Sequence, residues 1–352
     1  MRRVSKVAWG LVAVGAELSV FISHYWQLWL LWGLLVGLGT GAMALVFGSV
    51  VAKPWFSKCR GLVMGLFSGA NAAGQLVFLP SIVAIIENTS WRVATLVVKA
   101  FALLIIPLLR WPFANSPTKV GMLPYGGTEP AVPALKPHGS MAAATLRVLF
   151  SSARIPAFWV LATTFWICGW PTNGLVQTHF IPAAHDHGMP ATTDSGLLAL
   201  IGIFDILGTV FSGWLTDHVR PWLLLAVYYF LRGLSLLFLH SLMGPTIQPM
   251  LWIFIIFYGL DSVATVPPTV VLCRQYFGAV KATVVVGWVF AFHLVGAGTG
   301  SLTAGLSRES TGSYQAAWVT AAVLCLAAAV SLLLIPQMRQ STQVPEIEPA
   351  RS

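Results

Sequence analysis

The chain contains a succession of long apolar segments, and this pattern limits its fold more than any other feature. Each segment is close to the roughly 17–25 residues that a helix needs to cross a bilayer. The segments do not show the alternating pattern of barrel strands, so we predict ten transmembrane helices and an all-α multi-pass membrane protein. The helices are expected at about 7–23, 28–52, 61–86, 93–110, 157–182, 195–216, 222–243, 249–272, 283–306 and 316–335.

The composition agrees with a lipid environment. Hydrophobic residues make up 57% of the 352 residues and charged residues 9%, whereas a soluble domain carries about 25% charged residues. The formal net charge is +9, but no amphipathic element gathers Lys and Arg into a basic face, so we expect no nucleic-acid partner. The 4 cysteines form no CxxC pair; they are interpreted as small hydrophobic residues, and no cofactor is predicted.

The basic residues predict the orientation in the membrane. When successive segments alternate in direction, one side receives nearly all the Lys and Arg residues of the loops and ends, and the other receives only Arg92 and Arg308. Basic residues gather on the cytoplasmic side of membrane proteins. We therefore expect a cell (inner) membrane protein with both termini and the central connection in the cytoplasm.

One long connection, over 112–153, is rich in Pro, Gly and Ser and is predicted to be a flexible cytoplasmic linker. It separates an N-terminal bundle over 1–111 from a C-terminal six-helix bundle over 154–338, which is followed by a cytoplasmic tail over 339–352. Glycines spaced by four predict close helix packing in lipid. They are Gly33, Gly37 and Gly41; Gly61, Gly65 and Gly69; and Gly296 and Gly300.

A short basic and aromatic sequence occurs twice. KPWF at 53–56, followed by Arg60, recurs as RQYF at 274–277, followed by Lys281. Each copy lies between two long apolar segments. Parallel repeats joined by a long cytoplasmic linker are typical of secondary transporters.

These residues also carry a family resemblance. WFSKCRGL at 55–62 resembles the junction between helices four and five of monocarboxylate-porter-like members of the major facilitator superfamily. GWLTD at 213–217 resembles the superfamily's loop motif between helices eight and nine, and Trp91-Arg92 is similar to the family's opening of helix six. Two positions depart from these patterns: Cys59 replaces a basic residue, and His218 stands where the loop motif usually has Arg or Lys.

The resemblance implies a twelve-helix fold in two bundles of six. The repeat pairs the first four predicted helices with the last four, which leaves 157–182 and 195–216 as helices seven and eight. We therefore expect ten helices (4 + 6) of twelve, and a chain that lacks the first two helices of the family before Met1. A genuine ten-helix variant is the alternative.

Ionisable side chains inside predicted helices need a physical reason, since each costs on the order of 2.5–3.5 kcal/mol at mid-membrane. Asp205 shares one helix face with Thr209, Ser212 and Thr216. The resemblance implies that Asp205 handles protons and substrate, although Thr209 replaces the arginine that the porters carry there. The alternative is a buried carboxyl group that bonds to neighbouring helices.

Other polar residues are candidates for the same pathway, each with packing or interhelical hydrogen bonding as the alternative. Trp and amide side chains on one face suit an organic solute, a histidine can titrate near neutral pH, and an arginine could bind an anion. The helix with Asp261 should kink at Pro267-Pro268. The further candidates are Asp261, Trp170, Asn173, Gln177, Asn71, Gln75, His293 and Arg232.

Two groups lie near the predicted helix ends. The resemblance implies a cytoplasmic gate in which Asp217 pairs with Arg274 or Lys281, and a solvated turn is the alternative. Histidines and an aspartate also gather after helix seven. Because a metal site needs three or four ligands in fixed geometry, we expect an ordinary polar loop there, with a pH-sensitive gate or a metal site as alternatives. These residues are His179, His185, Asp186 and His187.

Together these features predict a secondary active transporter and no enzyme. We expect a monomer that moves a small organic solute, an organic anion or monocarboxylate above all, with protons and by alternating access. No GxxxxGK[ST] loop for ATP occurs. The alternatives are a non-transporting fragment or sensor and a membrane-embedded metal-dependent enzyme, for which neither HExxH nor GxSxG is found.

Overall fold

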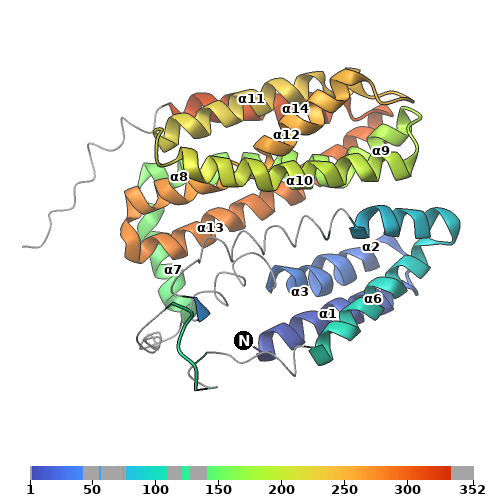
Figure 1. Cartoon of the computed structure of the whole chain (residues 1–352), viewed down its shortest axis with the longest axis horizontal. Helices are drawn as coiled ribbons and strands as arrows, with labels where there is room; N and C mark the ends of the chain where they lie inside the picture. The colour runs from blue at the N-terminus through green and yellow to red at the C-terminus, as the bar shows by residue number, and fades with distance from the viewer. Residues whose placement is uncertain are drawn as a thin grey trace, which may run out of the picture. The chain divides into compact units, whose positions relative to one another are not determined.

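The computed structural model describes residues 2–42, 77–108 and 141–333, with short stretches at 55–56, 74, 117 and 121–126. The chain divides into two compact units, Met1–Leu135 and Lys136–Ser352, and the division falls inside the predicted linker. The regular secondary structure of the described residues is helical, apart from one isolated bridge between Phe56 and Tyr125 (Figure 1). The prediction of an all-α protein is therefore confirmed.

The first unit is built around α1 (Arg2–Ser19). This helix packs against a second one, formed by α2 (Tyr25–Leu28), the π-helical η1 (Trp29–Val36) and α3 (Gly37–Ala42), and against α6 (Trp91–Leu108). A further apolar helix covers Val77–Asn88.

Small residues and one ion pair hold these helices together. Gly15 lies against Val36, and Gly39 lies against the backbone of α1. A Cβ atom at Gly33 or Gly41 would meet nothing within 4 Å, so the close approach seen here uses other glycines than that predicted series. The series Gly61, Gly65 and Gly69 lies outside the described residues. Inside the same unit Glu17 of α1 forms an ion pair with Lys99 of α6.

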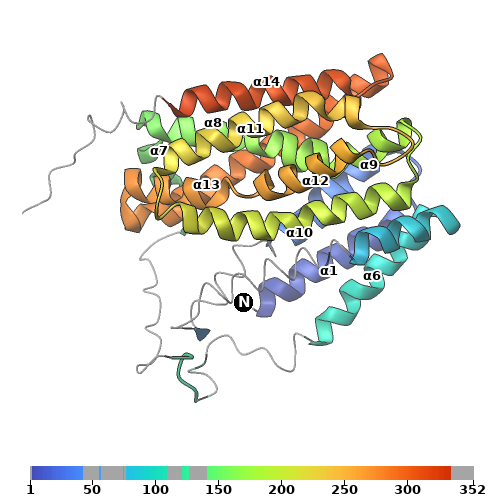
Figure 2. The ribbon, with the colours of Figure 1, turned by 45° about the horizontal axis from the view of Figure 1, so that its top comes forward.

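The second unit contains the longer helices. They are α7 (Met141–Ser152), α8 (Pro156–Gly169), the π-helical η3 (Trp170–Val176), α9 (Gln177–Asp186), α10 (Ala191–Leu215), α11 (Pro221–Leu242), α12 (Pro249–Ser262), α13 (Val266–Thr311) and α14 (Gln315–Leu332). Side by side lie α11 with α14, α8 with α13, and α10 with α12 (Figure 2).

Five stretches of the described chain are long and apolar enough to cross a membrane. A sixth, Pro156–Asp186, qualifies together with α7, from which it is bent by 104°. These six agree with the spans predicted between 157 and 335, whereas the described part of the first unit does not confirm the total of ten. The five are Thr193–Leu215, Pro221–Leu242, Pro249–Gly278, Lys281–Thr311 and Gln315–Leu332.

Two interruptions shape the chain between Pro249 and Thr311. Between α12 and α13 the helix is broken over 263–265, and Pro267-Pro268 lie in the first turn of α13. Proline is tolerated there because the first N–H groups of a helix have no internal partner. The break directly before these prolines confirms the interruption that the sequence predicted. Gly278, at φ 72°, then separates the two spans, directly after the repeated RQYF sequence.

The end of the predicted linker differs from expectation. The sequence predicts a flexible connection over 112–153, whereas residues 141–152 form the regular helix α7. Its sequence, MAAATLRVLFSS, holds no Gly or Pro and is rich in Ala and Leu, which have high helix propensity. Local propensity therefore outweighs the Pro- and Gly-rich composition of the segment before it.

Candidate functional site

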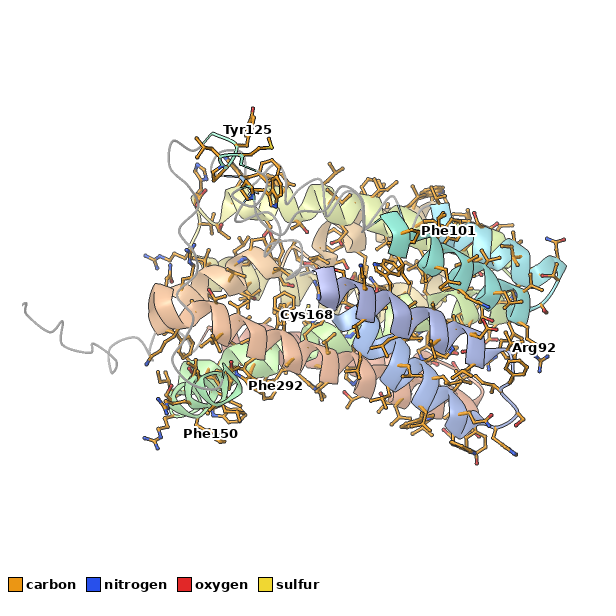
Figure 3. The ribbon with its side chains drawn as sticks, turned by 90° about the horizontal axis from the view of Figure 1, so that it is seen from below. Arg92, Phe101, Tyr125, Phe150, Cys168 and Phe292 are labelled. Carbon is orange, nitrogen blue, oxygen red and sulfur yellow. The ribbon has the colours of Figure 1, made fainter. Side chains whose placement is uncertain are left out.

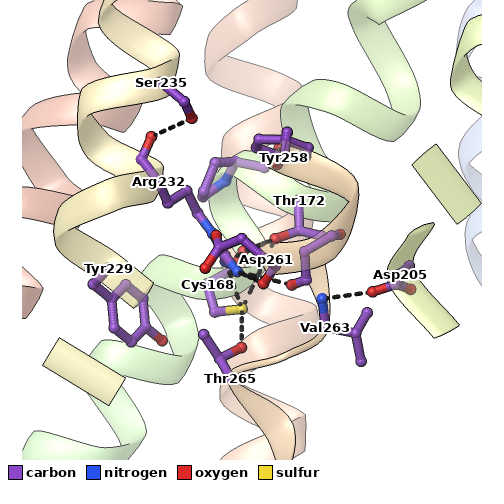
Figure 4. A network of polar contacts seen from close by, with 12 residues as sticks. Cys168, Thr172, Asp205, Tyr229, Arg232, Ser235, Tyr258, Asp261, Val263 and Thr265 are labelled. Atoms are coloured by element: carbon purple, nitrogen blue, oxygen red, sulfur yellow. Dashed lines mark hydrogen bonds and ion pairs between the residues drawn. The ribbon is translucent and has the colours of Figure 1, made fainter. Parts of the chain in front are cut away.

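The break between α12 and α13 interrupts a membrane span, and its free backbone groups need partners because lipid supplies none. The partners come from neighbouring helices (Figure 4). Carbonyl groups at the end of α12 and at Ala264 accept hydrogen bonds, and the N–H group of Val263 donates one. We call residues 261–265 and the side chains that bind them the junction.

Arg232 of α11 is the largest contributor to the junction and is fully buried. Its Nε donates to Asp261 Oδ2 over 2.6 Å, and its Nη2 donates to the carbonyl oxygens of Asp261 and Ser262 over 2.6 and 2.8 Å. Its Nη1 donates to Cys168 Sγ over 3.1 Å and to Thr172 Oγ1 over 3.3 Å. A guanidinium group has five N–H donors, so every donor of Arg232 has a protein acceptor.

Helix α10 supplies the other two contacts. Oδ1 of Asp205 accepts a hydrogen bond from the Val263 N–H over 2.7 Å, and Ser212 Oγ donates to the Ala264 carbonyl over 2.6 Å. Gly208 lets α10 and α12 approach closely, because a Cβ atom at this position would overlap the backbone of Leu260. Part of the predicted polar face of α10 therefore serves the broken helix.

The two aspartates of the junction differ in surroundings. Asp261 is 5% exposed, pairs with Arg232 through Oδ2 and leaves Oδ1 without a hydrogen-bond partner. Asp205 is only partly buried and binds a neutral backbone N–H instead of a cation. The two carboxyl groups therefore differ in their partners: Asp261 binds a cation, and Asp205 binds a backbone N–H group.

A second polar group lies on the π-helical turn η3, which contains Pro171. Asn173 Nδ2 donates to Gln177 Oε1 over 2.8 Å, and Asn173 Oδ1 lies 2.9 Å from His293 Nε2 on α13. Since Oδ1 is an acceptor, Nε2 carries the hydrogen. His293 Nδ1 then has no hydrogen-bond partner, and Gln177 is exposed. We call these three side chains the relay.

The relay lies where two backbones come very close. A Cβ atom at Gly169 or Gly174 would overlap the backbone of α13, and one at Gly296 or Gly300 would overlap the backbone of α8 or of Trp170. The predicted pair Gly296 and Gly300 is thus confirmed as a packing seam. Segments of π-helix are frequent at functional sites. Here η3 contains Asn173, and Gln177 follows directly after it.

The remaining predicted residues are placed as follows. Trp170 is 3% exposed and packs on Gly300, so it does not join the exposed part of the relay. Asn71 and Gln75 lie outside the described residues. Asp217, Arg274 and Lys281 are exposed, and among the ion pairs seen in the described parts of the chain none joins them. The cytoplasmic gate stays a prediction.

The histidine-rich end of α9 makes separate contacts. His179 lies 3.0 Å from the Ser301 carbonyl oxygen and 3.3 Å from the Tyr314 hydroxyl oxygen. Asp186 accepts two hydrogen bonds from Arg308. Where the structure describes the chain, no group of three or more potential metal ligands forms.

Sequence reasoning missed Cys168, Thr172 and Ser262 as members of the junction. Cys168 and Thr172 are four residues apart and so share a helix face, which could have marked them as a pair. Nothing in the sequence indicates that Arg232 from another helix would reach them. The backbone contact of Ser262 follows only from the position of the helix break.

Comparison with known proteins decides the family. The profile of the Major Facilitator Superfamily matches residues 2–301 and 180–351. The chain belongs to this superfamily. Its members are transporters that act on small molecules, so the chain is a multi-pass membrane protein of a transporter family and not an enzyme, as predicted.

Among known proteins, the chain is similar to monocarboxylate transporters and to a bacterial transporter of the superfamily. Monocarboxylate transporter 13 of Rattus norvegicus is 28% identical over 333 residues, which cover 93% of this chain and 71% of the relative. Human monocarboxylate transporter 12 is 25% identical over 355 residues, covering 94% and 67%. A transporter of the superfamily from Bacillus subtilis is 24% identical over 288 residues, covering 81% and 66%.

Solved structures agree on the fold. The fucose:proton symporter of E. coli aligns with a TM-score of 0.57 at 16% identity, covering 97% of this chain and 84% of the symporter. A bacterial homologue of the human lysosomal transporter Spinster, solved in an inward-facing, unoccupied conformation, aligns with a TM-score of 0.63 at 14% identity, covering 98% and 85%.

Proposed function

We propose that this protein is a secondary active transporter that moves a small organic anion, with monocarboxylates as the first candidates, together with protons. The observation that carries the proposal is Asp205, a partly accessible carboxyl group inside a membrane span and without a cation bound to it. The family membership and the names of the relatives support the solute class. An ion gradient supplies the energy through alternating access.

Asp205 is suited to carry the proton without disturbing the fold. Its Oδ1 accepts the hydrogen bond of the Val263 N–H. A protonated carboxyl group keeps one carbonyl oxygen as an acceptor, so this bond survives when the proton adds to the other oxygen. Proton uptake and release therefore leave the hydrogen bond between Val263 and Asp205 in place.

The relay is the proposed contact for the solute. Asn173 donates one amide hydrogen to Gln177 and has a second one to offer a solute. The exposed Gln177 amide can offer both of its hydrogens. These neutral donors fit a carboxylate. His293 supports them by fixing Asn173 Oδ1.

The sequence allowed Arg232 to bind the anionic solute, but its contacts favour a structural role. Its five donors are used within the protein, so an anion would have to displace the carbonyl groups of a broken helix. We therefore propose that Arg232 and Asp261 position the junction, and that the solute carboxylate binds to the relay.

The remaining expectations form part of the same proposal. The protein acts as a monomer with ten spans in a cell (inner) membrane, with both termini and the linker in the cytoplasm. Asp217 pairs with Arg274 or Lys281 at the cytoplasmic mouth in another conformation of the transport cycle.

Uptake by the full chain in proteoliposomes tests the function. Radiolabelled monocarboxylates such as lactate and pyruvate are supplied outside, with and without an inward proton gradient, and protein-free liposomes correct for passive entry. We expect saturable uptake that the gradient drives and a protonophore abolishes. Uptake that ignores the gradient contradicts proton coupling, and no uptake of any organic anion by well-folded protein favours a non-transporting role.

A further inference from the structure

Helix α7 stands apart from the other helices of the second unit in direction. It is bent by 104° from Pro156–Asp186. Figure 3 shows it nearly along its axis beside Phe150, while the long helices run across the picture. The helices α8, η3 and α9 have 14, 7 and 10 residues, which is about 45 Å at 1.5 Å per residue and enough to cross a bilayer without α7. A helix perpendicular to a span lies in the membrane plane.

One side of α7 packs on its own unit. The indole Nε1 of Trp288 on α13 donates to the carbonyl oxygen of Thr145 over 3.3 Å. Val148 and Leu149 are half-buried, and Ser152 is buried. In the connection to α8, the Trp159 indole donates to the Ala153 carbonyl over 2.8 Å. These contacts hold α7 at the end of the bundle.

The other side of α7 is exposed and mixed in character. Leu146 is 44% exposed and Phe150 is 66% exposed, one turn apart. Arg147, next to Leu146 on α7, and Arg154, in the turn that follows the helix, are also exposed. The stretch from Met141 to Val160 contains no acidic residue, and among the ion pairs of the described residues none involves either arginine.

This combination fits one place, the boundary between lipid headgroups and acyl chains. In water, Leu146 and Phe150 would stay unburied, and in the hydrocarbon core Arg147 and Arg154 would lack partners. At the boundary, the apolar pair enters the acyl region while the arginines reach the phosphates. Trp159, which is 48% exposed beside this face, extends the same surface as an interfacial anchor.

We propose that the exposed surface formed by Leu146, Arg147 and Phe150 of α7, with Arg154 in the turn that follows, binds the headgroups of anionic phospholipids in the leaflet next to the linker. The partner is the membrane itself and not a soluble phosphate or a protein. The lipid phosphates supply the counter-charge that no ion pair of the described residues gives these arginines, and they fix α7 where the connection between the two units enters the second one. This inference does not depend on the solute or on proton coupling.

Titration with phosphatidylglycerol tests the proposal on the full chain. Melting temperature in detergent is followed as phosphatidylglycerol is added, with phosphatidylcholine and inorganic phosphate as separate additions. We expect only phosphatidylglycerol to stabilise the protein. Each arginine near an anionic surface contributes about a fivefold gain in affinity, so the double variant R147Q/R154Q should weaken the apparent affinity roughly 30-fold.

Arg220 supplies a matched control. It is also exposed and precedes α11, so R220Q removes one charge outside α7 and should weaken the affinity less than fivefold. A loss in R220Q equal to that in R147Q/R154Q, or equal stabilisation by phosphatidylcholine or phosphate, overturns the proposal.

The depth of α7 is a second, independent readout. A spin label at Phe150→Cys, measured against the unsubstituted chain in nanodiscs, should be more accessible to oxygen than to a water-soluble nickel chelate. Higher accessibility to the nickel chelate places the face in water and overturns the proposal even if the titration shows a lipid preference.

Discussion

The junction and the relay are two polar groups inside the same bundle, and they differ in how fully their hydrogen-bonding capacity is used. At the junction, Arg232 has an acceptor for each of its five donors. At the relay, His293 Nδ1 has no partner and the exposed Gln177 amide has free hydrogens. Both contain residues that a sequence would mark as functional.

The difference indicates which group meets the solute. Because every donor of Arg232 is already used, the junction can bind an anion only by first losing some of these bonds, and leaving a buried polar group unpaired costs about 1–3 kcal/mol, or more when it is charged. A network with spare donors gains bonds when a ligand arrives. We therefore assign stability to the junction, solute contact to the relay, and proton transfer to Asp205, which belongs to the junction but is only partly buried.

The substitution Arg232→Met should have the largest effect on folding. It leaves the Asp261 carboxylate and the two carbonyl groups at the end of α12 without partners, and breaking a buried pair in this way costs about 3–5 kcal/mol. Denaturation in detergent measures the loss. The control R220Q removes an exposed charge and should change stability little. A loss in R232M as small as that in R220Q contradicts the structural role.

Asp205→Asn should affect transport more than folding. The asparagine side-chain oxygen can still accept the Val263 hydrogen bond, but it cannot take up a proton near neutral pH. We expect proton-driven uptake to fall at least about 100-fold, equivalent to about 2.7 kcal/mol, with stability nearly unchanged. Asp205→Ala, which also removes the acceptor, should lose stability as well. Normal proton-driven uptake in the asparagine variant would remove Asp205 from the mechanism.

Gly296→Ala tests the seam that carries the relay. The added methyl group would overlap the Trp166 carbonyl oxygen, and overpacking of this kind costs about 1–3 kcal/mol. Gly298→Ala, on the same helix with nothing within 4 Å, is the matched control and should be neutral or slightly stabilising. Equal melting temperatures for the two variants would show that the helices are less tightly packed than described.

Asn173→Ala should separate solute binding from proton transfer. Losing one hydrogen bond to a charged solute corresponds to about 1.5 kcal/mol, so the KM for uptake should rise roughly tenfold. The ratio of protons to solute should not change. Thr163→Ala on α8, whose hydroxyl bonds only to its own helix, should leave the KM as it is. An unchanged KM in N173A moves the solute away from the relay.

Arg308→Gln should have the smallest effect on stability, and it provides an exposed Arg–Asp pair for comparison with the buried pair of Arg232 and Asp261. Arg308 also binds an aspartate through two hydrogen bonds, but at the exposed end of α13. Exposed pairs contribute little and weaken in salt. Melting curves at low and high salt should show a minor loss that salt removes. A loss comparable to that of R232M would mean that burial is not what distinguishes the two pairs.

Much of the fold could be predicted because lipid imposes a simple rule. The long apolar segments between 157 and 335 matched the helices, and Pro267-Pro268 marked the break. Helix α7 was not predicted, since its helical propensity is hidden behind a Pro- and Gly-rich stretch. The series Gly33, Gly37 and Gly41 was misjudged because spacing alone does not say which residues face a neighbour.

The site was predictable in its residue types but not in its connections. Asp205, Asp261, Asn173, Gln177 and His293 stood out as polar groups within apolar segments. That Arg232 would saturate its donors on a broken helix depends on three helices meeting, and Cys168 carried no polar signal at all. Trp170 was placed on the pathway by its helix face, but Gly300 on the opposite helix opens the space that buries it.

Proton flux driven by the solute tests the central claim most directly. Proteoliposomes hold a pH-sensitive dye, and a monocarboxylate that uptake assays identify is added outside, with protein-free liposomes as the baseline. The account predicts that the native chain acidifies the lumen above this baseline, and that D205N, equally stable, does not. Acidification by D205N at the native rate, or solute uptake by the native chain without any proton movement, would contradict it.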